Sequence, residues 1–194
     1  KQGKVLVDAK VVMIGAGGTG NAIAFVLAER GARICIINRT VTKADELARR
    51  SNTRRGAEGA HAFGEELLSQ MLIGANVVIN TSTKGAIGEF EAYSALASAK
   101  LPATPENIQE NLEVSLRSFD FIPHETIVSD IVLRDGSTPF LRQAREEGYL
   151  TLDGIPMVIN QGVEAFLILH GDEVGRTEEV RDTLREVMRF AAGL

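Results

Sequence analysis

Three glycines, Gly15, Gly17 and Gly20, have the spacing Gly-x-Gly-x-x-Gly and directly follow an apolar run at residues 11–14. The spacing suits phosphate binding: the first glycine allows a sharp turn, the second lets the backbone approach a pyrophosphate, and the third lets a helix pack closely on a strand. Residues 21–30 then show helical spacing of apolar side chains, and residues 33–38 form a second apolar run. We therefore predict a βαβ unit whose helix directs its free N–H groups toward a dinucleotide.

The end of the second apolar run indicates which dinucleotide binds. An NAD site has an acidic residue there for the ribose 2′-hydroxyl, whereas the 2′-phosphate of NADP needs cations. This chain has Asn38-Arg39-Thr40, and Lys43 lies in the first turn of the next predicted helix. Arg39 can bind the phosphate or stack on adenine, and Thr40 offers a hydroxyl and an N–H. We therefore predict that the coenzyme is NADP. The alternative for Arg39 and Lys43 is that they are ordinary surface cations, and the alternative for the glycine turn is that it only joins a strand to a helix.

Length and composition limit the other possibilities. With 194 residues, 44% of them hydrophobic, the chain is most simply one domain over residues 1–194. The net charge is −5 and basic residues alternate with acidic ones, which argues against nucleic acid and membrane partners. A membrane span of about 18 apolar residues and a signal-peptide pattern are both missing from the sequence, so we expect a cytoplasmic protein.

Cysteine and histidine usage excludes two kinds of site. Cys35 is the single cysteine and lies in a predicted strand, so an internal disulfide is excluded and the thiol is expected to be a small buried apolar group. His61, His124 and His170 are far apart in the sequence and lack ligand spacing. We therefore predict no metal and three surface histidines.

The rest of the chain alternates between predicted strands and helices. Strands are predicted at residues 60–63, 77–81, 126–132 and 149–152; helices at 43–50, 65–72, 91–100, 105–116, 139–147, 157–170 (ended by Gly171) and 177–192; and a loop at 51–59. This order predicts an α/β fold, a Rossmann-like doubly wound sheet of six mostly parallel strands with helices on both faces. The polar turn at residues 80–85 follows a strand, at the edge where such sheets bind ligands, although a plain surface connection is the alternative.

Nearly the whole chain resembles the NADP-binding C-terminal domain of the shikimate/quinate dehydrogenase family. The resemblance rests on the glycine turn, Asn38-Arg39-Thr40 with Lys43, Ile79-Asn80-Thr81-Ser82, Ser129-Asp130-Ile131-Val132, Thr138-Pro139-Phe140-Leu141, Ala144, Gly148, Asp153-Gly154, Met157-Val158-Ile159-Asn160-Gln161 and Ala165-Phe166. It implies an enzyme of aromatic amino acid biosynthesis that reversibly reduces 3-dehydroshikimate to shikimate with NADPH, or acts on quinate or a similar cyclic hydroxy acid. Hydride passes at the nicotinamide while another group handles the proton.

The residues that we predict to bind NADP are Gly15, Ala16, Gly17, Gly18, Thr19, Gly20, Asn38, Arg39, Thr40, Lys43, Asn80, Thr81, Ser82, Thr83, Gly154 and Met157. By the resemblance Gln161 reaches the substrate hydroxyls; the alternative is an amide on a helix surface. The resemblance also places the catalytic Lys–Asp pair in an N-terminal substrate domain. Because the chain starts near its first strand without methionine, we expect a piece of a longer protein. By the resemblance it has no catalytic residue of its own and is inactive alone, and its expected partners include a second copy in a homodimer.

Several residues differ from the family pattern and leave the substrate open. Leu133 and Arg134-Asp135 replace the family's Tyr and Asn-Pro, Thr83 and Ala86 are unusual, and the segment at residues 85–119 is long. Nothing in the sequence supports Lys84 as a substitute catalytic base. Two other functions remain possible: a non-catalytic NADP-binding sensor or scaffold, and an NADP-dependent dehydrogenase for a folate or pterin substrate, which would give Gln161 no role.

Overall fold

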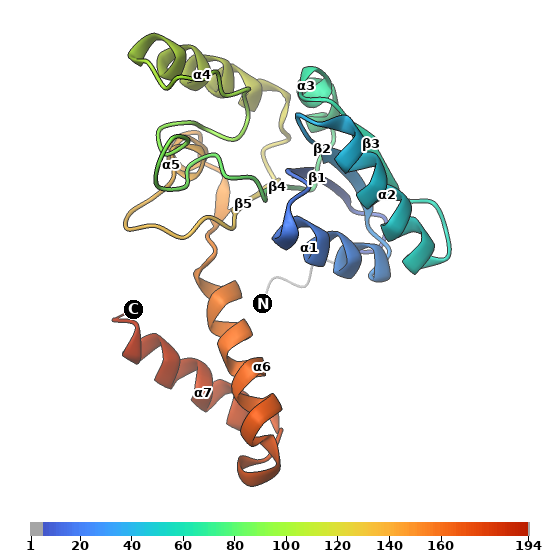
Figure 1. Ribbon diagram of the computed structural model, residues 1–194, viewed down its shortest axis with the longest axis vertical. Coiled ribbons are helices and arrows are strands. Elements are labelled where there is room, and N and C mark those ends of the chain that lie inside the picture. Colours follow the sequence, from blue (N-terminus) through green and yellow to red (C-terminus); the bar gives the residue numbers. More distant parts are fainter. Residues whose placement is uncertain (1–5, 194) are drawn as a thin grey trace. The chain divides into compact units, whose positions relative to one another are not determined.

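The computed structural model describes residues 6–193 (Figure 1). The chain forms two compact units, Lys1–Asp153 and Gly154–Leu194. The first unit contains the sheet and the glycine turn, and the second is a pair of helices. The assignment of residues 1–194 to a single domain stays a prediction.

One parallel sheet organises the first unit. Its strands, within the described residues, are β1 (Lys10–Ile14), β2 (Arg33–Ile37), β3 (Ala60–Phe63), β4 (Val77–Asn80), β5 (Ile127–Asp130) and β6 (Leu150–Leu152). They pair in the order β3-β2-β1-β4-β5-β6, and each described pair is parallel, which confirms the predicted Rossmann-like fold. The direction of winding changes between β1 and β4, so their carboxyl ends border the crevice where such sheets bind ligands.

Helices cover both faces of this sheet, as predicted. They are α1 (Gly18–Glu29), α2 (Val41–Arg55), α3 (Leu68–Leu72), α4 (Pro105–Ser118) and α5 (Pro139–Glu146), with short 3₁₀ turns η1 (Glu65–Leu67) and η2 (Phe119–Phe121). Successive side chains of a strand point to opposite faces. Val11 and Met13 of β1 therefore pack in the core under α1 and α2, whereas Val12 and Ile14 pack with residues of α3 and α5 on the other face.

The second unit consists of α6 (Ile155–Val174) and α7 (Glu178–Ala191). The two helices run antiparallel: Arg181 pairs with Glu164, and the Arg185 guanidinium donates to the Asn160 side chain at 2.9 Å. The predicted end at Gly171 is wrong, because α6 continues to Val174 and the glycine with positive φ that ends it is Gly175, at φ 83°.

The loop predicted at residues 51–59 is wrong in its first half, because α2 continues to Arg55. Asn52, a residue type that favours turns, lies inside the helix and bonds to backbone groups before and at the start of β3. Its Oδ1 accepts from the N–H groups of Gly59 at 3.0 Å and Ala60 at 2.8 Å, and its Nδ2 donates to the Ala60 carbonyl. These tertiary bonds outweigh the local preference for a turn.

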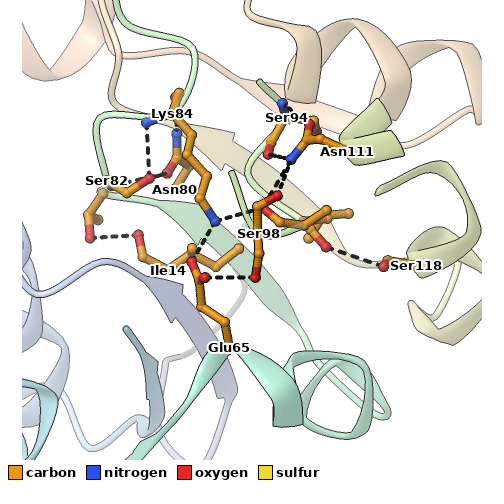
Figure 2. A network of polar contacts seen from close by, with 12 residues as sticks. Ile14, Glu65, Asn80, Ser82, Lys84, Ser94, Ser98, Asn111 and Ser118 are labelled. Carbon is orange, nitrogen blue, oxygen red and sulfur yellow. Dashed lines mark hydrogen bonds and ion pairs between the residues drawn. The ribbon is translucent and has the colours of Figure 1, made fainter. Parts of the chain in front are cut away.

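The helix predicted at residues 91–100 is also wrong, because the segment consists of turns. Residues 93–97 are all buried, a pattern with no exposed helical face. Asn111 of α4 supplies the hydrogen bonds that a helix would have made itself (Figure 2): its Oδ1 accepts from the Ser94 N–H at 2.8 Å, and its Nδ2 faces the carbonyls of Ser94 and Ala97. The second predicted helix of this region is confirmed as α4, with Thr104 as its N-cap.

Candidate functional site

The three motif glycines have different surroundings. Gly15 has φ 112°, and a Cβ there would lie 2.7 Å from the Ser82 amide nitrogen. A Cβ on Gly20 would lie 2.9 Å from the Thr81 hydroxyl, so this glycine lets α1 pack on the loop after β4. A Cβ on Gly17 would meet no described atom within 4 Å. The first and third glycines therefore permit close packing, and the second faces the open space where the sequence predicts a pyrophosphate.

Two helices begin beside this space. Gly17 is the N-cap of α1, and the exposed Gly18 and Thr19 form its first turn. Thr40 is the N-cap of α2, and Asn38 fixes the turn before it by donating to the Thr40 carbonyl at 2.8 Å. Neither first turn carries an acidic residue. Free N–H groups and the positive ends of two helix dipoles thus border one space, an arrangement that favours anions.

A cavity of about 260 Å³ lies at the carboxyl ends of β1, β2 and β4. The predicted site residues that line it are Gly15, Ala16, Gly17, Asn38, Arg39, Thr40, Lys43, Thr81, Ser82 and Thr83. The strand order brings the three stretches together, because β1 pairs with both β2 and β4. Their roles in binding stay predictions.

The other predicted site residues lie elsewhere. Asn80 is fully buried beneath the loop: its Oδ1 accepts from the Ser82 N–H and hydroxyl, and its Nδ2 donates to the Lys84 carbonyl and to Asp130. Asn80 therefore does not line the cavity; its hydrogen bonds hold the loop of residues 82–84, which does. Gly18, Thr19 and Gly20 form the start of α1 next to the cavity lining. Gly154, Met157 and Gln161 belong to the second unit, where Gln161 is exposed on α6.

Sequence reasoning missed Glu65, Lys84, Phe90 and Ala99, which also line the cavity. The Lys84 side chain is almost fully buried, and its Nζ donates to Glu65 Oε1 at 2.6 Å and to the Ala97 carbonyl at 2.7 Å (Figure 2). Burial lowers the pKa of Lys84 and the Glu65 carboxylate opposes this shift. The sequence does contain a signal for Glu65. This residue lies two positions after the predicted strand at residues 60–63, and the residues that follow strands in such sheets border the ligand crevice.

Asp130 forms a second buried polar centre at the end of β5. Its Oδ1 accepts from Asn80 at 2.9 Å and from the Val132 N–H at 3.0 Å, and its Oδ2 accepts from the Thr138 hydroxyl at 2.7 Å. Burial raises the pKa of this carboxyl from 3.8 to about 6, although the three hydrogen bonds oppose the shift. Asp130 thus links the loop after β4 to the N-cap of α5.

Arg134 and the long segment at residues 85–119, both departures from the family pattern, contact each other. Arg134 donates through Nη1 to the Gly85 and Glu91 carbonyls, each at 3.1 Å, and its Nη2 pairs with the Glu91 carboxylate at 2.9 Å. Arg134 therefore holds the long segment after β4 against the connection between β5 and α5.

The histidines offer no alternative site. His61, His124 and His170 are exposed, as predicted, and residues 6–193 contain no group of three acidic, histidine or cysteine side chains placed to hold a metal ion. Cys35 is half-buried on β2, so it is less enclosed than we predicted, although it packs against the core. None of the helices in the described part of the chain is long and apolar enough to cross a membrane.

The sequence model of one protein family, described as Shikimate / quinate 5-dehydrogenase, matches residues 1–101, just over half of the chain. The chain belongs to this family. A curated relative, "Shikimate dehydrogenase (NADP(+))" of Methanosarcina barkeri, is 32% identical over 164 residues. The match covers 84% of this chain and 51% of the relative, so the chain spans about half the length of such relatives.

Two solved structures resemble the chain. Shikimate 5-dehydrogenase from Listeria monocytogenes, in complex with shikimate and NAD, has a TM-score of 0.70 at 26% identity, and the match covers 94% of this chain and 56% of that one. Ligand-free 5-ketofructose reductase of a Gluconobacter species has a TM-score of 0.61 at 28% identity, with 96% and 58% covered. The names of these three proteins thus differ in the substrate and in the coenzyme that they mention.

Proposed function

We propose that this chain is the NADP(H)-binding part of an oxidoreductase that reduces 3-dehydroshikimate, or a similar cyclic keto acid, reversibly with NADPH. The observation that carries the coenzyme assignment is the position of Arg39. It follows β2, at the place where an NAD site has its acidic residue, and it lines the same cavity as the glycine turn.

The surroundings of Arg39 support a phosphate ligand. Arg39 is exposed, and it has no ion pair with another residue of the described chain. Its guanidinium is therefore available to bind a 2′-phosphate through charge-assisted hydrogen bonds. Lys43, on the first turn of α2, lines the same cavity and adds a second cation. A relative that carries NADP(+) in its name agrees with this assignment.

The catalytic part of the proposal rests on family membership. The resemblance assigns proton transfer to a Lys–Asp pair of a substrate domain, and Gln161 to the substrate hydroxyls. Membership favours dehydrogenation over a purely sensory or scaffolding role and over a folate-type substrate. Arg134, one of the departures from the family pattern, pairs with Glu91 between β4 and β5, so the proposal leaves open which cyclic keto acid is the natural substrate.

The test is a fluorescence titration of the chain with NADPH and with NADH, repeated with Arg39→Ala. A charge-assisted contact to the phosphate corresponds to about 10- to 150-fold in affinity. Arg39→Ala should weaken NADPH binding by that factor and leave NADH binding nearly unchanged. On the same preparation, shikimate with NADP⁺ should give no steady-state rate, because the acid–base pair lies in the substrate domain.

Arg49→Ala provides the matched control. Arg49 is an exposed cation on α2 that does not line the cavity, so its loss removes the same charge without touching the proposed contact. The variant should keep the affinities of the unmodified chain for both coenzymes. Equal losses for NADPH and NADH in Arg39→Ala would contradict the assignment of Arg39, and a chain that binds NADH as tightly as NADPH would contradict the choice of NADP.

A further inference from the structure

A carboxylate lies in the cavity beside the proposed phosphate site. Ile37 of β2 pairs with Phe63 of β3, and Arg39 and Glu65 each follow their strand by two positions. The register therefore brings an acid and the predicted phosphate-binding cation to neighbouring strand ends, and both line the same cavity. An unrestrained carboxylate there would repel a 2′-phosphate and would compete for the Arg39 guanidinium.

The structure holds this carboxylate on both oxygens. Glu65 Oε1 accepts from Lys84 Nζ at 2.6 Å, and Oε2 accepts from the Ser98 hydroxyl at 2.8 Å (Figure 2). The Glu65 side chain is 16% exposed and that of Lys84 is 9% exposed, so solvent screens the ion pair only weakly. Lys84 Nζ is in turn fixed by the Ala97 carbonyl at 2.7 Å.

We propose that Lys84 is a positioning residue for coenzyme choice: it binds Glu65 and so leaves Arg39 free for a 2′-phosphate. The inference rests on the proposed NADP site and adds a determinant to it. Lys84 itself touches neither substrate nor nicotinamide in this proposal. Its ammonium neutralises the acid that the β3 register brings into the cavity, and the segment after β4 supplies Ala97 and Ser98 to complete the arrangement.

Electrostatics within the cavity agrees with this arrangement. Arg39 is close enough to Lys84 for their repulsion to lower the pKa of Lys84, so the two cations act on the same space. Without the Lys84 ammonium, Glu65 would be a buried acid without its partner, a state that is relieved by pairing with another cation or by protonation of the carboxylate. Arg39 and Lys43 are the cations that line the cavity besides Lys84 among the described residues.

The experiment measures dissociation constants for NADPH and NADH with four proteins: the unmodified chain, Lys84→Met, Glu65→Gln and the double variant. Lys84→Met should weaken NADPH binding about tenfold or more, the size of a lost charge-assisted contact, and change NADH binding by less than about threefold. Glu65→Gln should bind NADPH at least as tightly as the unmodified chain. The double variant should recover the NADPH preference, because it removes the acid together with its partner.

Thermal unfolding of each variant separates coenzyme choice from folding. If Lys84→Met does not fold, the double variant and Glu65→Gln still decide the question, because neither leaves an unpaired acid. Loss of NADPH preference in either of these would overturn the inference, as would a folded Lys84→Met that keeps the preference or that loses both coenzymes equally. A lack of NADPH preference in the unmodified chain would instead contradict the proposed NADP site itself.

Discussion

Asp130→Asn tests the buried polar centre at the end of β5. Asp130 is fully buried and its pKa is raised from 3.8 to about 6, so the folded chain holds the carboxyl proton more tightly than the unfolded chain does. Between these two pH values unfolding releases a proton, and a rise in pH therefore favours the unfolded state. The stabilising contribution of the protonated carboxyl is complete below pH 3.8 and is lost as the pH rises through about 6.

The magnitude follows from the size of the shift. A shift of about two pKa units at 1.36 kcal/mol each gives a total of about 3 kcal/mol, of which about 2 kcal/mol falls between pH values of about 4.5 and 8. An asparagine side chain does not titrate in this pH range, and it has nearly the same shape as aspartate. Its Oδ1 can still accept from Asn80 and from the Val132 N–H. The free energy of unfolding of Asp130→Asn, relative to the unmodified chain, should therefore rise by about 2 kcal/mol between the two pH values.

Urea denaturation followed by far-UV circular dichroism at several pH values provides the measurement. Asp45→Asn is the control: Asp45 is an exposed acid on α2, and its replacement should change stability by no more than about 0.5 kcal/mol at any of these pH values. A difference between Asp130→Asn and the unmodified chain that stays constant with pH would refute the reasoning, as would a difference that falls with rising pH.

Two further substitutions test the glycine turn and the segment after β4. Gly17→Ala places a methyl group in open space, so it should cost at most about 1 kcal/mol of unfolding free energy. In the fluorescence titration it should weaken NADPH binding at least about tenfold, and an unchanged NADPH affinity would contradict the assignment of Gly17 to the pyrophosphate. Asn111→Ala should lower the free energy of unfolding by about 2–5 kcal/mol, because it leaves several buried backbone groups of residues 94–98 without a partner. Asn107→Ala, which removes an exposed bond on the same helix, should cost less than about 1 kcal/mol in the same urea titration, and equal losses for the two variants would show that Asn111 does not support the segment.

Local sequence signals were sufficient to predict the secondary structure where backbone groups bond to residues nearby in the sequence. The βαβ unit around Gly15 and Arg39 was predictable, because the apolar runs, the glycine spacing and the helical periodicity all indicate the same structure. The helix starts at Pro105 and Pro139 were predicted, and in the structure Thr104 and Thr138 are the N-caps of α4 and α5.

Two of the errors occur where a distant side chain replaces local bonding. Residues 91–100 have a composition that permits a helix, but their backbone groups are bonded by Asn111, more than ten positions away. Asn52 acts in the same way between α2 and β3. Neither interaction can be read from propensity or spacing, because it depends on which elements the fold brings together.

The candidate site shows the same division. The glycine turn, Asn38 to Lys43 and the loop after β4 were named from the sequence, and the structure gathers them around one cavity. Glu65 and Lys84 were not named as binding residues, because their pairing depends on the register of β3 and on the path of the segment after β4. Periodicity locates β3, but it does not show which acid meets which cation.

The pairing of β1 with β4 has a consequence for how coenzyme binding affects the stability of the folded sheet. Strands β1 to β3 pair in the order in which they follow one another along the chain, whereas Ile14 pairs with Asn80 across the intervening α1, β2, α2, β3 and α3, and such long-range pairing is entropically costly and slow. The Thr81 hydroxyl, which donates to the carbonyls of Ile14 and Gly15, closes this seam directly beneath the proposed pyrophosphate. A coenzyme bound across the seam would stabilise this contact by mass action. Saturating coenzyme would therefore oppose opening of the sheet along the line between β1 and β4.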